Sequence, residues 1–115
     1  MKLIYCATPK RIFHKSNEII NKVLSTGNAP FFPFFSFPIN IFEDGPIGRE
    51  KTINFCLKSI EICDELWFFG LSEGTILELN HAKNIGKKIR FIDLFDNEWE
   101  LNKKQIEELK SVIVK

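Results

Sequence analysis

The residues best suited to chemistry lie in the stretch SEGTILE, residues 72–78. This stretch follows the very apolar run LWFFGL and ends on Glu78, which stands between two leucines. A carboxylate among large apolar side chains costs free energy unless a partner stabilises it. Gly74 and Thr75 indicate a helix start, where backbone N–H groups favour anions. Glu78 is therefore a candidate functional carboxylate; the alternative is an ordinary exposed helix glutamate.

Four further polar residues are candidates because they lie within or just after predicted strands. Tyr5, near the carboxyl end of the first strand, could hydrogen-bond a carboxylate and orient it, or could simply pack. Lys10 and Arg11 follow that strand and could bind a phosphate, or could be solvated surface residues. Ser72 follows the third strand and is expected near the same cleft.

The segment APFFPFFSFPINIF, residues 29–42, is unusually rich in phenylalanine and proline. The prolines allow only a brief strand, predicted over residues 31–35. Successive strand side chains face opposite ways, so these rings cannot all enter one core. Phe34 and Phe35 could wall an apolar slot that stacks on a flat base. A dimer interface or a plug over the sheet edge explains the same pattern equally well.

The elements that must position these residues alternate between strand and helix. Strands alternating with helices predict a parallel sheet, here a small doubly wound α/β domain of the flavodoxin or Rossmann type with helices on both faces. Residues 1–115 are expected to form one domain. Ligands of such sheets bind outside the carboxyl ends of the strands. The predicted strands are KLIYCA, residues 31–35, ELWFFG and KIRFIDLF, and the predicted helices are 16–25, 50–63, 73–86 (ending at Gly86) and 102–110.

Composition excludes several classes of function. The 115 residues are 44% hydrophobic and 27% charged, with a net charge of +1. This balance argues against a nucleic-acid polymer or an anionic membrane as partner. No stretch approaches the roughly 18 apolar residues of a membrane span. The three cysteines are odd in number and lack CxxC spacing, so we expect a reducing cytoplasm and no structural zinc.

Taken together, the patterns IYCA, PFFPF, CDELWFFG and SEGTILELNHAKNIGKKIRFI carry a family resemblance. The chain resembles the nucleoside 2-deoxyribosyltransferase-like superfamily over about residues 2–93. The likeness is to its small uncharacterised members, and the superfamily includes the 2'-deoxynucleoside 5'-phosphate N-hydrolases. The most specific part is the G-T-x-x-E helix, followed by an alanine and a G-K turn.

The resemblance implies cleavage or transfer of the N-glycosidic bond of a (deoxy)nucleoside or its 5'-monophosphate, without metal or cofactor. Glu78 falls on the family's nucleophile and Tyr5 on the tyrosine that holds it. Ser72 matches the serine that helps bind the 5'-phosphate in the hydrolases, and Lys10 and Arg11 lie in the loop that would complete such a site. The other implied substrate contacts are Gly74, Thr75, Phe34, Phe35 and Cys56.

One departure from the family pattern bears on activity. The family carries an aspartate eight residues before the aspartate that opens the third strand, and counting back from Asp64 gives Cys56. A thiol is a poor substitute for that carboxylate, which contacts the sugar and aids proton transfer. The first loop also lacks the hydrolases' glycine-rich phosphate loop, and Pro9 removes a backbone donor.

Two other functions therefore compete with the glycosidase. A non-catalytic nucleotide-binding or sensing module on the same fold is the main alternative. A cytokinin-type phosphoribohydrolase ranks lowest, because the P-G-G-x that precedes the G-T-x-x-E helix in that family is absent here. Relatives complete the site from a neighbouring subunit, so a homodimer or higher homo-oligomer is expected.

Overall fold

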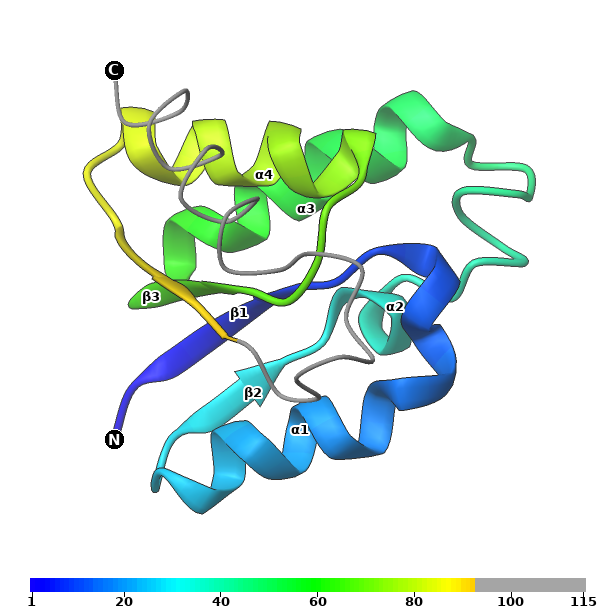
Figure 1. Cartoon of the computed structure of the whole chain (residues 1–115). Coiled ribbons are helices and arrows are strands. Elements are labelled where there is room, and N and C mark those ends of the chain that lie inside the picture. Colours follow the sequence, from blue (N-terminus) through cyan, green and yellow to red (C-terminus); the bar gives the residue numbers. More distant parts are fainter. Residues whose placement is uncertain (93–115) are drawn as a thin grey trace.

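The computed structural model of the chain describes residues 1–92. Within this range the fold is a four-stranded, all-parallel sheet with helices on both faces (Figure 1). This confirms the predicted doubly wound α/β fold. The elements are β1 (Leu3–Ala7), the 3-10 helix η1 (Lys10–Lys15), α1 (Ser16–Ser25), β2 (Ala29–Phe31), α2 (Pro33–Ser36), α3 (Arg49–Ile62), β3 (Glu65–Phe68), α4 (Glu73–Asn84) and β4 (Lys88–Phe91).

The strand order is β2-β1-β3-β4, so the chain reverses direction across the sheet between β1 and β3. It first moves from β1 to β2, then returns through α3 to the far side of β1. Tyr5 pairs in register with Phe31 of β2 on one side and with Leu66 of β3 on the other. Helix α1 covers one face of the sheet, and α3 and α4 lie together on the opposite face (Figure 1). The reversal makes β1 and β3 the place where a ligand pocket is expected.

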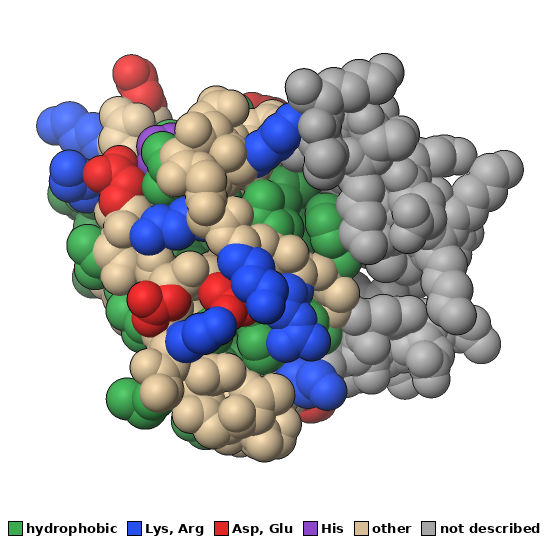
Figure 2. All heavy atoms as spheres, turned by 90° about the vertical axis from the view of Figure 1, so that its left-hand side faces the viewer, with side chains coloured by type: hydrophobic (Ala, Val, Ile, Leu, Met, Phe, Trp, Pro, Cys, Tyr) green, Lys and Arg blue, Asp and Glu red, His purple; other side chains and the backbone are tan. Residues whose placement is uncertain are grey.

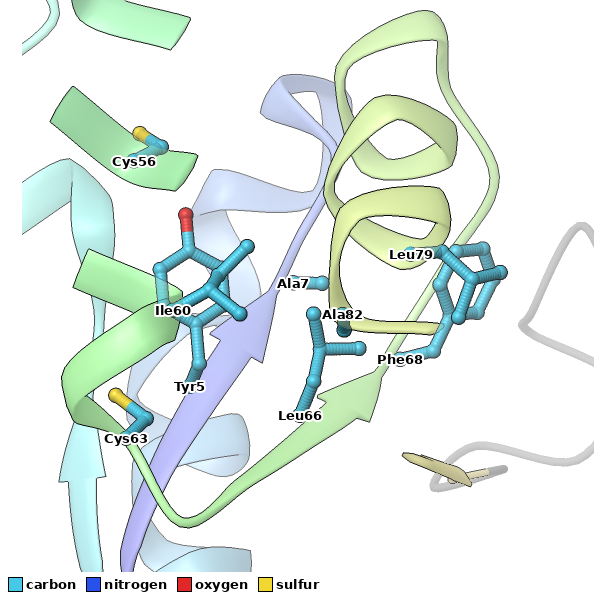
Figure 3. Close-up of a cluster of buried hydrophobic side chains, with 9 residues drawn as sticks. All are labelled: Tyr5, Ala7, Cys56, Ile60, Cys63, Leu66, Phe68, Leu79 and Ala82. Atoms are coloured by element: carbon cyan, nitrogen blue, oxygen red, sulfur yellow. The ribbon is translucent and has the colours of Figure 1, made fainter. Parts of the chain in front are cut away.

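Side-chain alternation along β1 and β3 divides the core into two layers. Ile4 and Cys6 point toward α1, whereas Tyr5 and Ala7 point toward α3 and α4. Because strand side chains alternate in direction, this parity fixes the face that each residue can reach. The Tyr5 side chain is consequently on the same side of the sheet as α4. The remaining members of that layer are Cys56, Ile60, Cys63, Leu66, Phe68, Leu79 and Ala82 (Figure 3).

The predicted strand over residues 31–35 is wrong. Strand β2 ends at Phe31, and Pro33–Ser36 form the short helix α2. Pro33 occupies the first turn, where its fixed φ and missing N–H suit a helix start. The end of the predicted fourth strand (residues 93–95) and the predicted helix Asn102–Lys110 lie outside the described residues.

Two glycines shape segments that matter for the site. Gly86 adopts a positive φ of 76° directly after α4. The Gly86 N–H donates to the Lys83 carbonyl oxygen and the Lys87 N–H donates to the Ala82 carbonyl oxygen, so the helix ends in a Schellman motif. This confirms the helix end predicted at Gly86. Gly45 lies in the loop between α2 and α3. A Cβ there would come within 2.3 Å of the Asn40 carbonyl oxygen, so this loop requires glycine.

The face of the molecule at the amino ends of the strands carries intermixed charges (Figure 2). At this edge Lys2 bonds Glu65 at 2.7 Å, and this bond lowers the pKa of the Glu65 carboxyl. The mixture is consistent with the small net charge of the chain. No helix within residues 1–92 combines the length and apolarity that a membrane span requires.

Candidate active site

A pocket of about 420 Å³ opens at the carboxyl edge of the sheet, beside the reversal between β1 and β3. It lies where the fold class predicts a ligand. Four segments supply its walls: the loop after β1, the segment between β2 and α3, the first half of α3, and the start of α4. The described lining residues are Thr8, Lys10, Phe34, Glu43, Asp44, Arg49, Thr52, Ile53, Cys56, Ser72, Glu73, Gly74, Thr75 and Glu78.

Glu78 lies on the inner face of α4. Thr75, Glu78, Leu79 and Ala82 are all buried, at the spacing that places residues on one side of a helix. Glu78 is only 8% exposed, whereas its neighbour Leu77 is 41% exposed and faces outward. The alternative of an exposed helix glutamate is therefore wrong, and the carboxyl group contributes to the pocket wall.

Tyr5 donates a hydrogen bond from its hydroxyl to Oε2 of Glu78. The tyrosine is fully buried on the central strand β1, so its phenol has little freedom to move. Figure 3 shows the hydroxyl pointing toward Cys56. The phenol does not itself line the pocket; it lies behind Glu78 and orients it. Burial raises the pKa of Tyr5 well above its ordinary value, which keeps the phenol a donor.

Desolvation dominates the electrostatics of Glu78. Burial raises the pKa of the Glu78 carboxyl to about 8. Contacts with the Tyr5 hydroxyl and the Cys56 thiol lower this pKa, and the Glu43 carboxylate raises it further. The neutral acid therefore predominates at pH 7 in the empty pocket. A strongly shifted carboxyl in a cleft is typical of functional sites.

Cys56, on α3, is buried beside this pair and lines the pocket. Burial raises the pKa of the Cys56 thiol to about 12. The thiol is therefore neutral at physiological pH and is neither a nucleophile nor a ready proton donor. This matters because a carboxylate occupies the matching position in the resembled family.

The start of α4 is closed by a capping box. The Ser72 hydroxyl accepts from the Thr75 amide at 3.1 Å, and the Thr75 hydroxyl accepts from the Ser72 amide at 2.8 Å. Thr75 also donates to the Gly70 carbonyl oxygen at 2.8 Å. Gly74 has no steric need to be glycine, since the nearest atom to an added Cβ is 4.0 Å away. Its missing side chain leaves space on the pocket wall.

Charged residues form the pocket rim, and sequence reasoning found Lys10 but missed Glu43, Asp44, Arg49 and Glu73 as members of the site. Lys10 pairs with Asp44 at 2.5 Å. Arg49 pairs with Glu43 at 2.5 Å and with Glu73 at 3.5 Å. Residues 43–49, EDGPIGR, carry no local motif that singles them out as part of a site. The available signal is their position, because they belong to the connection from β2 to α3, which leaves the sheet at the same edge as the other loops.

The phenylalanines divide between the pocket wall and its support. Phe34 lines the pocket. Phe35 does not; it is 54% exposed and lines a neighbouring hollow with Phe13, whose ring lies 5.8 Å away. Phe31 stacks on Tyr5 at 5.6 Å and thereby supports the catalytic candidate from behind. Arg11 is exposed and lies outside the pocket lining.

No group of three or more His, Cys, Asp or Glu side chains within residues 1–92 is arranged to hold a metal ion. The cysteines of this range are spread through the two core layers, and burial raises the pKa of each thiol.

Comparison with known proteins gives a family but not a function. A search of curated proteins finds no match to the chain. A family model described as a domain of unknown function, DUF7768, matches residues 4–92, which include Tyr5, Cys56 and Glu78. Because the match covers most of the chain, the protein belongs to the DUF7768 family.

Proposed function

We propose that the protein cleaves or transfers the N-glycosidic bond of a (deoxy)nucleoside or its 5'-monophosphate, with Glu78 as nucleophile. The observation that carries this proposal is the buried Glu78 carboxyl, held by Tyr5 on the wall of the pocket. The volume of about 420 Å³ is in the range of small-molecule sites. The resemblance in the G-T-x-x-E helix supports the same role.

In the proposed first step, the ionised carboxylate attacks the anomeric carbon through Oε1, the oxygen that Tyr5 does not hold. The bond between this carbon and the base nitrogen breaks, and its electron pair leaves with the base, which takes a proton from solvent water. In the second step, water or another base attacks the sugar ester and frees Glu78. Positive charge develops on the sugar in both steps, so ionised Glu78 stabilises the transition state electrostatically.

The surrounding residues have defined parts in this scheme. Tyr5 acts as a positioning residue, because its hydrogen bond fixes the rotamer of Glu78. Phe34 offers an aromatic face for the base. Glu43 lines the same pocket but is paired with Arg49 at 2.5 Å, so it is a proton acceptor and not the acid that Cys56 cannot supply. A homo-oligomer and a cytoplasmic location remain predictions of this proposal.

A non-catalytic nucleotide-binding module is the second candidate. The neutral Cys56 thiol favours it, since a carboxylate at this position contacts the sugar in the resembled family. Both candidates require a ligand in the pocket, and only the first requires release of free base.

The test is a screen of (deoxy)nucleosides and their 5'-monophosphates for thermal stabilisation, followed by a chromatographic assay for free base. Ligand at about a hundredfold excess over Kd stabilises by about 2.7 kcal/mol, which is easily detected. Glu78→Gln should abolish base release while leaving ligand affinity within about tenfold. Glu18→Gln, an exposed change on α1 across the sheet, serves as matched control.

Turnover that survives in Glu78→Gln would refute the nucleophile assignment. Stabilisation without base release from any ligand would instead select the binding module.

A further inference from the structure

Within residues 1–92, the side chains of the pocket rim carry more negative than positive formal charge. Among the described lining residues, the basic side chains are Lys10 and Arg49. They face Glu43, Asp44 and Glu73, which leaves a formal charge of −1 before Glu78 is counted. Ionisation of Glu78 would make the pocket more negative still. A pocket built for a phosphate dianion normally has the opposite balance.

Both cations are already paired with these carboxylates. Lys10 is 2.5 Å from Asp44, and this contact raises the pKa of the lysine, which keeps it charged. Arg49 is shared between Glu43 at 2.5 Å and Glu73 at 3.5 Å. Exposed ion pairs are weak, so a phosphate could break one of them. The displaced carboxylate would nevertheless remain tethered beside the phosphate and repel it.

Two donors that a phosphate would use at the start of α4 are also engaged. The capping box occupies the Thr75 amide with the Ser72 hydroxyl, at 3.1 Å. The Thr75 hydroxyl in turn donates to the Gly70 carbonyl oxygen at 2.8 Å. A phosphate could recruit these groups only by opening the cap, which is worth about 1 kcal/mol to a helix.

We infer that the pocket selects a nucleoside with an uncharged 5' end over the corresponding 5'-monophosphate. The inference rests on the proposed function, which takes the ligand to be a nucleoside or nucleotide. It narrows the proposed ligand class from nucleosides and nucleotides to nucleosides, because of the charge of the rim. The rim residues are Lys10, Glu43, Asp44, Arg49 and Glu73. A 5'-hydroxyl can hydrogen-bond to carboxylates, whereas a 5'-phosphate adds like charge to them.

The experiment measures Kd by calorimetry on full-length Glu78→Gln protein, so that no ligand is consumed. The common deoxynucleosides and ribonucleosides are compared with their 5'-monophosphates at one fixed ionic strength, with inorganic phosphate as a separate competitor. We expect the best nucleoside to bind at least about tenfold more tightly than its monophosphate. Inorganic phosphate should not displace it.

A second variant tests the cause. Asp44→Asn combined with Glu73→Gln removes two exposed carboxylates from the rim. Lys10 then loses its ion pair with Asp44, and Arg49 loses its ion pair with Glu73. Monophosphate affinity should rise about tenfold, while nucleoside affinity should not rise, so the ratio between the two should fall about tenfold. Glu18→Gln with Glu50→Gln makes the same change in net charge on helix residues outside the pocket lining, and should leave the ratio unaltered.

The inference would be overturned if monophosphates bound the Glu78→Gln protein as tightly as nucleosides. It would also be overturned if the two double variants changed the ratio of monophosphate to nucleoside affinity equally. If the wild-type protein releases base from monophosphates in preference to nucleosides, the inference fails and the glycosidase proposal stands. If nucleosides are preferred but never cleaved, the inference stands and the binding module replaces the enzyme. If nothing in the panel binds, both fail.

Discussion

Replacing the buried carboxyl at position 78 by an amide should stabilise the protein, and by more at higher pH. Burial raises the pKa of Glu78 from the ordinary value of 4.5 to about 8. Between these values the unfolded chain has lost the proton and the folded chain still holds it. The folded state then binds more protons, so stability falls as pH rises through this window. Glu78→Gln removes the titrating carboxyl, and therefore also removes the loss of stability that accompanies its ionisation.

The size of the effect follows from the same two values. A difference of one pKa unit corresponds to about 1.4 kcal/mol. The wild-type protein should therefore lose about 3 kcal/mol relative to Glu78→Gln between pH 4.5 and pH 7, and about 4 kcal/mol between pH 4.5 and pH 9. Glu78 is 8% exposed, so solvent screening reduces this figure little. The amide also keeps an oxygen that can accept from Tyr5.

The assay is urea unfolding followed by circular dichroism at pH 5, 7 and 9, for wild type and for Glu78→Gln. The difference between the two free energies of unfolding cancels every other titrating group. Glu18→Gln on the opposite face of the sheet is the control for the chemical change from glutamate to glutamine outside the site. A difference that stays flat with pH for Glu78→Gln would show that the Glu78 carboxyl titrates normally, and would refute the desolvated site.

Three further changes test the site and its supports. If ionised Glu78 is the nucleophile, kcat/KM should rise with pH to a plateau above about 8. Tyr5→Phe removes a hydrogen bond that lowers the pKa of Glu78, so this variant should move the midpoint of the profile to higher pH. A profile that falls above pH 8 would mark Glu78 as an acid instead. Gly74→Ala should stabilise the protein by about 0.5–1 kcal/mol in urea unfolding, because the site has room for a methyl group, while weakening ligand-induced thermal stabilisation. Gly45→Ala should cost about 1–3 kcal/mol and weaken ligand binding, because its Cβ would meet the Asn40 carbonyl oxygen in the loop that carries Glu43 and Asp44; unchanged unfolding would contradict that geometry.

The fold was largely predictable because local patterns specify it. Strands β1 and β3 are short apolar runs, and the helices have apolar residues at helical spacing between clear stop signals. The exceptions within residues 1–92 were the 3-10 helix η1, which was not predicted, and residues 31–35. The phenylalanines of residues 31–35 favour a strand, but Pro33 starts a helical turn, and the competition could not be resolved from composition.

The candidate site was predictable only in part. Glu78 and Tyr5 were paired through a family resemblance, since spacing alone did not separate a buried glutamate from an exposed one. The structure brings them together across 73 positions of sequence. Glu43, Asp44 and Arg49 were missed, because nothing local shows that a charged loop folds back over a pocket.

The sequence by itself determined an alternating strand and helix pattern, and therefore a parallel sheet whose loops gather at one edge. It also indicated a helix start at Gly74 and Thr75 with Glu78 one turn later, and left open whether that carboxyl is buried or exposed. Only the tertiary structure decided that Glu78 is desolvated and that the cations of the rim are paired with carboxylates. The physical reason is that periodicity depends on neighbours in the chain, whereas desolvation and charge balance depend on segments distant in sequence that pack around one point.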